Sequence, residues 1–140
     1  MGRQALHEAY LSSDYVVTTP AGNVTLRADG PPVGDVRAIE AVSGRRITVV
    51  TAWNPRSVEQ SVEANRDAND HLRADLNACR WIVWDAVGKG RPTQAQAWSE
   101  DSFAVVDADP DEVRHLAHTY GQNAVLVWDG VRGSIVWCDA

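Results

Sequence analysis

The stretch that decides the fold is RITVVTAWNPRS, residues 46–57. Residues 46–53 are rich in β-branched side chains and largely apolar on both alternating faces, which predicts a central strand buried on both sides. Asn54-Pro55 ends this strand, because proline lacks the N–H group that a sheet ladder needs. Ser57 followed by Gln60 forms a capping-box pattern, which predicts a long helix over Ser57–Ala78 with Val58, Val62, Leu72 and Leu76 on its apolar stripe.

Further elements follow on both sides of this stretch. We expect strands at Cys79–Asp85 and Phe103–Val106, joined by a long polar loop, and a helix from Pro110 to about Tyr120 that Gly121 ends. A last hairpin pairs Ala124–Trp128 with Ser134–Cys138. Before residue 46 the sequence predicts a short helix over residues 3–12, a hairpin of Tyr15–Thr19 with Val24–Arg27, a loop over Asp29–Gly34, and a short helix from Asp35 to about Val42.

The order of these elements predicts the fold class. The first six elements after residue 45 alternate as strand, helix, strand, strand, helix and strand, which is the split βαβ pattern of ferredoxin-like folds. We therefore predict an α+β fold: a mixed or antiparallel sheet with two main helices on it, a split βαβ (ferredoxin-like) core, an N-terminal hairpin and a C-terminal strand. A length of 140 residues predicts a single domain, 1–140.

Composition and charge exclude several classes of protein. With 44% hydrophobic and 23% charged residues, the chain is not a disordered chain, a collagen or a coiled coil. No apolar run is long enough to span a membrane, and a net charge of −6 argues against broad nucleic-acid binding. The first ten residues lack a signal-peptide pattern, so we expect a cytoplasmic protein. Its two cysteines, Cys79 and Cys138, are most simply two buried thiols; the alternative, a disulfide between them, needs an oxidising compartment.

The long helix carries two amides where apolar side chains are expected. Asn65 and Asn69 each fall within about 20° of the centre of the predicted apolar stripe. A buried amide is costly unless it makes its hydrogen bonds. Either these two side chains bond to backbone at a sheet edge or a bulge, or they line a ligand pocket.

The junction between the central strand and the long helix is a second candidate site. The N–H groups at a helix start favour an anion, Asn54 could aim its amide at the same space, and Arg56 could supply charge. The alternative is a plain strand-to-helix turn.

The loop after the second strand is a third candidate. Its sequence Gly88-Lys89-Gly90-Arg91-Pro92 lacks the ending of a phosphate-binding P-loop, so that motif is rejected. A mobile surface loop with solvated cations is one interpretation; a binding loop that offers Arg91 and Trp98 is the other. One of the neighbours Glu100 and Asp101 must point inward, and an inward Glu100 is a candidate general acid or base.

Gln122 lies between a helix stop and a buried strand. It either satisfies loop backbone groups or faces the same pocket as Asn54 and Asn65. His115 and His118 fall away from the apolar face of their helix and lack a third ligand, so we expect no metal site, and no cofactor is indicated.

Four motifs occur together in this chain: Thr51-Ala52-Trp53-Asn54-Pro55, Asn65, Trp98-Ser99-Glu100 and Tyr120-Gly121-Gln122-Asn123-Ala124. In this combination the chain resembles a small bacterial family known as domain of unknown function 3293. The resemblance extends from about Tyr15 to Trp137, while residues 86–97 match little. Because the family has no assigned activity, the resemblance implies none; it does imply that Asn54, Asn65, Glu100 and Gln122 are motif positions.

Two functions fit the sequence. In the first, a polar pocket between the long helix and the sheet binds, or acts on, a small polar or anionic metabolite. Its residues would be Asn54, Asn65, Asn69, Glu100, Gln122 and Trp98, with Arg56 or Arg91 neutralising an anionic group. In the second, an acidic, tryptophan-rich surface makes the chain a non-enzymatic interaction or accessory module, with a protein partner or a second copy. The sequence leaves open whether the protein is an enzyme, and predicts neither a nucleic-acid nor a membrane partner.

Overall fold

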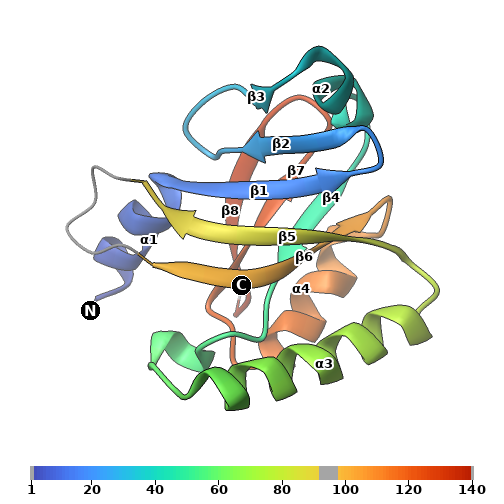
Figure 1. Cartoon of the computed structure of the whole chain (residues 1–140). Coiled ribbons are helices and arrows are strands. Elements are labelled where there is room, and N and C mark those ends of the chain that lie inside the picture. The colour runs from blue at the N-terminus through green and yellow to red at the C-terminus, as the bar shows by residue number, and fades with distance from the viewer. Residues whose placement is uncertain (1, 92–97, 140) are drawn as a thin grey trace.

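The computed structural model describes residues 2–91 and 98–139. Its described strands form one antiparallel sheet in the order β3-β2-β1-β5-β6-β4-β7-β8 (Figure 1). The helices are α1 (Arg3–Leu11), α2 (Val36–Val42), α3 (Val62–Ala78) and α4 (Pro110–Thr119). The strands are β1 (Ser13–Thr19), β2 (Gly22–Leu26), β3 (Val33–Gly34), β4 (Ile47–Val50), β5 (Ile82–Gly90), β6 (Ser99–Val106), β7 (Ala124–Trp128) and β8 (Gly133–Trp137).

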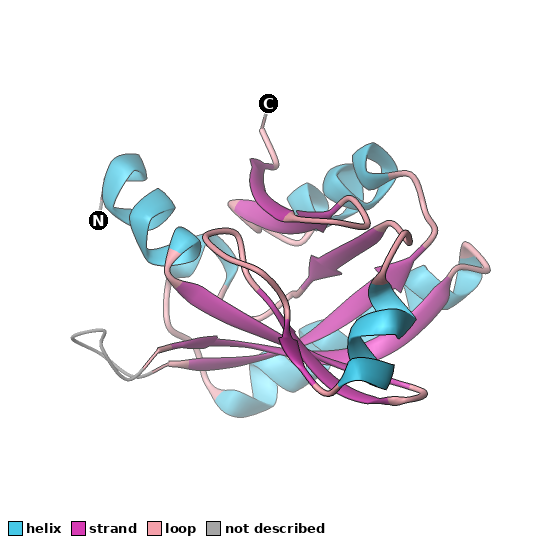
Figure 2. Cartoon of the chain, turned by 90° about the horizontal axis from the view of Figure 1, so that it is seen from above, coloured by secondary structure: helices cyan, strands magenta, loops and turns pink. Residues whose placement is uncertain are grey.

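The sheet is strongly curled. In Figure 1, β1, β2, β5 and β6 cross the front of the molecule, while β4, β7 and β8 run behind them at a steep angle. Seen from above in Figure 2, the two groups of strands form two walls set apart from each other, with α1 beside one end. The sheet therefore has a concave and a convex face, and side chains alternate between them along each strand.

The convex face is covered by α3 and α4. Leu72 and Leu76 of α3 pack there with Phe103 of β6, and Val113 and Ala117 of α4 belong to the same buried cluster. All four residues of β4 are buried, and β4 lies between β6 and β7. The prediction of a central strand is confirmed, but the strand is shorter than predicted: it spans Ile47–Val50 and not residues 46–53.

The concave face is packed at the end where α2 lies. Ala38 and Val42 of α2 join Leu26, Leu126 and Trp128 in a second buried cluster. The indole Nε1 of Trp128 donates a hydrogen bond of 2.9 Å to the carbonyl oxygen of Val42. This cluster fills one half of the concave side and leaves the half beside α1 to larger polar and aromatic side chains.

The predicted α+β class, the antiparallel sheet and the N-terminal hairpin are confirmed. The helix α3 connects β4 to β5 along the chain, and in the sheet β6 lies between these two strands. The strand β7 lies on the other side of β4. The sheet then continues through β1, β2 and β3 at one edge and β8 at the other. The ferredoxin-like assignment of the central part stays a prediction.

The predicted start of the long helix is wrong. Arg56 and Ser57 have φ values of 58° and 60°, in the left-handed region that a right-handed helix excludes. Residues 55–57 instead form an irregular turn, and α3 begins at Val62. Its N-cap is Ser61, whose Oγ accepts a hydrogen bond of 3.1 Å from the N–H of Ala64, so the predicted Ser57 capping box does not form.

The apolar stripe of that helix also differs from the prediction. Val58 is 65% exposed and lies outside the helix, and Val62, the first residue of α3, is 52% exposed. The buried positions of α3 are Asn65, Asn69, Leu72 and Leu76. The amides themselves therefore form half of the stripe that faces the protein.

Three smaller corrections concern the loops and Cys79. The glycines of the predicted loop after residue 85 belong to β5, which continues to Gly90, and residues 92–97 of that loop lie outside the described residues. The predicted loop over Asp29–Gly34 contains the short strand β3. Cys79 is exposed because it caps the end of α3, whereas Cys138 is buried as predicted.

Candidate functional site

A cavity of about 720 Å³ occupies the unfilled half of the concave side. Its volume lies within the range of pockets that hold small ligands. Leu6 and Tyr10 of α1 line one end, and Ile135 of β8 lines it from the strands behind. This cavity does not lie between the long helix and the sheet, since α3 packs on the convex face and reaches the cavity only near its N-terminal end, through Val62 and Asn65. A second, smaller cavity of about 430 Å³ does lie between α3 and the strands β5 and β6. The predicted position of the ligand pocket stays a prediction.

Three cross-strand neighbours form the floor of the cavity. The antiparallel register sets Tyr15 of β1 opposite Gly88 of β5, and Gly88 opposite Glu100 of β6. Residues that are directly opposite in a sheet point to the same face, so Tyr15 and Glu100 share the concave side. All three residues line the cavity.

Glu100 is the inward member of the predicted pair. Its side chain is half-buried, and its carboxyl group makes no hydrogen bond or ion pair with the residues that the structure describes. Burial raises the pKa of Glu100 to about 7, because the charged form loses hydration that no partner replaces. Burial also raises the pKa of Tyr15 above its ordinary value, and the nearby Tyr10 and Glu100 add to that shift.

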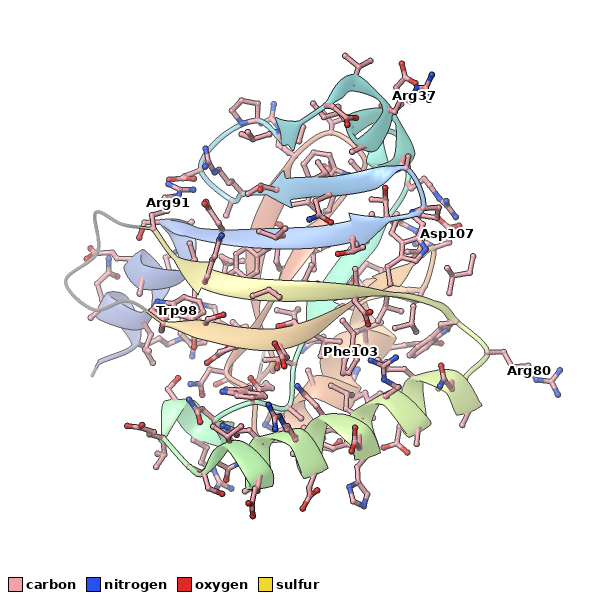
Figure 3. All side chains as sticks on the ribbon, in the orientation of Figure 1. Arg37, Arg80, Arg91, Trp98, Phe103 and Asp107 are labelled. Atoms are coloured by element: carbon pink, nitrogen blue, oxygen red, sulfur yellow. The ribbon has the colours of Figure 1, made fainter. Side chains whose placement is uncertain are left out.

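Gly88 makes room for aromatic rings beside Glu100. A Cβ atom at Gly88 would lie 3.6 Å from ring carbons of both Tyr15 and Trp98. Figure 3 shows Trp98 at the start of β6, at the end of the sheet near α1. Trp53 and Tyr10 also line the cavity, so four aromatic side chains surround the floor.

The amides of Asn54 and Asn65 bond mainly to each other. The backbone N–H of Asn54 donates to Oδ1 of Asn65 at 2.8 Å, and Nδ2 of Asn65 donates to Oδ1 of Asn54 at 2.8 Å. Gln60 adds a bond of 2.7 Å from Nε2 to Oδ1 of Asn65 and one of 3.2 Å from its N–H to Oδ1 of Asn54. Both asparagines line the cavity, but most of their hydrogen-bonding capacity is used to hold residues 53–60 in place.

Asn69 is not brought to the cavity. Its Oδ1 accepts a hydrogen bond of 2.8 Å from the N–H of Ala52, and its Nδ2 donates one of 2.9 Å to the carbonyl oxygen of Asp101. These bonds join β4 and β6 just where the two strands stop pairing. Asn69 therefore bonds to backbone at the point where β4 and β6 separate, and its side chain lines the smaller cavity beside α3.

Gln122 lies where two motifs meet. Its Nε2 donates a hydrogen bond of 3.1 Å to the carbonyl oxygen of Trp53, and its side chain lines the cavity. The preceding Gly121 has a φ of +73°, and a Cβ there would lie 2.9 Å from Cβ of Pro55. The N–H of Arg56 donates to the carbonyl oxygen of Gly121 at 2.7 Å. The Asn-Pro and Gly-Gln motifs are therefore two sides of one contact.

The two arginines predicted to meet an anion lie elsewhere. Arg56 is exposed and does not line the cavity. Arg91 bonds to Asp29 at 2.6 Å and to Asp14 at 2.7 Å, and Arg27 bonds to Asp14 at 2.8 Å. Arg27 and Arg91 together hold the pKa of Asp14 below its ordinary value, and Arg91 does the same for Asp29. Arg91 therefore connects β5 to β1 and to the segment after β2.

The anion site predicted at the start of the long helix does not form. The N–H of Ser57 donates to the carbonyl oxygen of Asn54, and that of Val58 to the carbonyl oxygen of Pro55. The N–H groups of Asn54 and Gln60 bond to the asparagine side chains described above. These donors are used inside the turn and are not offered to a ligand.

Sequence reasoning missed Tyr10 and Tyr15. Their place in the cavity depends on the docking of α1 and on the register of β1 against β5, which local patterns do not specify. The i, i+4 spacing of Leu6 and Tyr10 on a helix was a signal that these two side chains face the same way.

Metal sites and membrane spans are absent from the described parts of the chain. No group of three or more His, Cys, Asp or Glu there is arranged to hold a metal ion, and no helix there is long and apolar enough to cross a membrane. His115 and His118 are exposed, and Nδ1 of His115 lies 2.7 Å from the carbonyl oxygen of Asp111.

Comparison with known proteins identifies the family. Residues 50–125, more than half of the chain, match the family described as protein of unknown function (DUF3293). The matched segment begins at the last residue of β4 and contains the 53–60 turn, α3, Glu100 and the Gly-Gln motif. Neither the curated proteins nor the solved structures gave a match. The chain therefore belongs to the DUF3293 family of proteins of unknown function.

Proposed function

We propose that the protein binds a small polar ligand in the concave cavity, and that the carboxyl group of Glu100 accepts a hydrogen bond from this ligand. The observation that carries the proposal is a half-buried carboxyl group inside a cavity of about 720 Å³, with no hydrogen-bond or ion-pair partner among the described residues. A buried polar group that finds no partner in the protein costs free energy, and a ligand can supply that partner.

The charges of the cavity wall favour a neutral or cationic ligand over an anionic one. The charged side chains among its described lining residues are Glu59 and Glu100, and no Arg, Lys or His is among them. Residues 92–97, whose placement is not described, read PTQAQA and carry no charged side chain. An anion would meet like charge there without compensation.

Glu100 is also the group suited to proton transfer. A carboxyl group with a pKa of about 7 exchanges protons readily at neutral pH, which is what general acid–base catalysis requires. Binding is nevertheless the function that the geometry supports best, because the amides of Asn54, Asn65 and Gln122 orient groups but do not react.

The interaction-module alternative has weaker support. The large apolar side chains that are exposed in the described residues are Val33, Val36, Val58, Val62, Ile82 and Val131, and none is a tryptophan. These residues are spread over several elements, while four aromatic side chains, including Trp53 and Trp98, line the cavity. An interaction surface predicts the opposite distribution.

A thermal-shift screen tests the proposal. We expect at least one member of a panel of amines, amino acids, nucleosides, sugars and their phosphates to raise the melting temperature of the protein in a saturable manner. The shift should be lost in Glu100→Gln and kept in Glu40→Gln, which removes an exposed carboxyl group on α2. A flat response across the panel, or a shift that Glu100→Gln leaves intact, would contradict the proposal.

A further inference from the structure

The wall of the concave cavity combines aromatic rings with negative charge. Tyr10, Tyr15, Trp53 and Trp98 line it, and the charged groups described above are carboxyl groups. The faces of aromatic rings carry partial negative charge and attract cations, most strongly where water is displaced. Rings and carboxyl groups therefore favour ligands of the same sign.

These two features meet at one place on the floor. Gly88 stands between Tyr15 and Glu100 in the sheet register, so no side chain separates the phenol ring from the carboxyl group. The ring carbons of Tyr15 and Trp98 reach the same 3.6 Å distance from the position that a Cβ of Gly88 would take. A single compact group of a ligand seated over Gly88 would lie close to both rings and to Glu100.

We infer that the ligand is an organic ammonium ion whose charged head sits over Gly88, beside Glu100 and the rings of Tyr15 and Trp98. This inference rests on the proposed function and names the chemical class of its ligand. A neutral ring in the same place would fill space but leave the carboxylate without an opposite charge. A cation satisfies the carboxylate and the rings together.

Proton linkage gives the inference a distinctive signature. A cation binds the ionised form of Glu100, and burial holds the pKa of this group at about 7 in the empty protein, so cation binding should release a proton at neutral pH. The affinity should therefore rise as the pH increases from 6 to 8. Tyr10, Tyr15 and Glu59 are the other titratable side chains in the described wall, and Glu100→Gln tests whether Glu100 is the source of the effect.

The experiment compares three probes that share a phenyl ring and a short alkyl chain. Isothermal titration calorimetry would measure the binding of 2-phenylethylammonium, 2-phenylethanol and 3-phenylpropionate to the full chain. We expect the ammonium ion to bind about tenfold or more tightly than the alcohol, and the carboxylate to bind weakest. The preference for the ammonium ion should grow with pH.

Variants separate the contributions of the carboxyl group and the rings. Glu100→Gln should remove both the preference for the ammonium ion and its pH dependence, whereas the exposed control Glu40→Gln should change neither. Trp98→Leu should lower the affinity for the ammonium ion more than the affinity for the alcohol. Trp98→Phe should keep most of the preference for the ammonium ion, because phenylalanine retains an aromatic face. Thermal unfolding of each variant checks that it is folded.

The possible outcomes distinguish this inference from the proposed function. Equal affinity for the ammonium ion and the alcohol would overturn the inference. If Gly88→Val, which fills the floor of the cavity, then removed the binding of both probes, the cavity would still be a ligand site and the proposed function would stand. Preference for 3-phenylpropionate, or no binding by any of the three probes, would also overturn it. The broader thermal-shift panel decides independently whether the cavity binds a ligand at all.

Discussion

At the scale of the single residue, Glu100 carries a cost that depends on pH. Burial raises its pKa from the ordinary 4.5 to about 7, so between these values the folded protein binds more protons than the unfolded chain. Because the charged form of Glu100 is disfavoured in the folded protein, the free energy of unfolding falls progressively as the pH rises through this window. Glu100→Gln should raise the free energy of unfolding, by about 2 kcal/mol more at pH 8 than at pH 5.

Denaturant unfolding of both proteins at the two pH values measures this difference. Glu40→Gln, which removes an exposed carboxyl group, should show no comparable change between pH 5 and pH 8. An equal effect of Glu100→Gln at both values would mean that the carboxyl group is already hydrated in the empty cavity.

Asn65 should matter more for stability than its place in a polar pocket implies. Asn65→Ala would leave the N–H of Asn54 and the amide of Gln60 without their acceptor, so we expect a loss of about 2 kcal/mol or more. Asn77→Ala on the exposed side of α3 should be neutral or slightly stabilising, because alanine favours helix. Chemical denaturation would measure both, and similar losses would contradict the role assigned to Asn65.

At the scale of the element, the 53–60 turn depends on its contact with the start of β7. Gly121→Ala should cost about 2–3 kcal/mol, since it adds left-handed strain and brings a Cβ to 2.9 Å from Cβ of Pro55. Gly44→Ala is the matched control, because Gly44 has a similar φ of +75° but no atom within 4 Å of the added carbon. Equal losses of unfolding free energy in the two variants would show that the contact contributes nothing.

The elements also show how far the sequence alone leads. The apolar run 46–53 predicted a central strand because both its faces had to be buried, and β4 is central. The start of α3 was missed because the left-handed conformations of Asn54, Arg56 and Ser57 arise from the docking of Pro55 on Gly121. That contact joins residues far apart in the sequence, so no local pattern reports it.

Part of the candidate site could be predicted from the sequence. Five predicted site residues line the cavity: Asn54, Asn65, Trp98, Glu100 and Gln122. They could be selected because each is a polar or aromatic residue at a position where an apolar core residue or a turn was expected. Their roles as ligand contacts stay a prediction. The arginines could not be assigned, because Arg91 is captured by Asp14 and Asp29, which approach it only after β1, β2 and β5 assemble.

At the scale of the whole molecule, α1 closes the cavity without belonging to the core. None of its residues is fully buried, and the buried Nδ1 of His7 has no hydrogen-bond partner in the described part of the chain. Arg3 and His7 hold the helix against Trp137, with the Arg3 guanidinium carbon 4.1 Å from the ring centroid. Deletion of residues 2–11 should therefore leave one cooperative unfolding transition and return the pKa of Glu100 toward its ordinary value.

Carbon-13 NMR titration of the Glu100 carboxyl group, in the full and the shortened chain, would measure this change. Loss of the folded sheet on deletion would contradict the peripheral role of α1. A pKa that stays near 7 would show that the strands alone keep water from the carboxyl group.

The aromatic lining has a practical consequence. Of the six tryptophans in the chain, Trp53 and Trp98 line the cavity. Indole emission responds to the polarity and charge of its surroundings, so an occupant of the hollow should alter the protein's own fluorescence. The chain thus contains an intrinsic fluorescent reporter of ligand binding, and replacing Trp98 with phenylalanine would show how much of the signal arises from the indole at the start of β6.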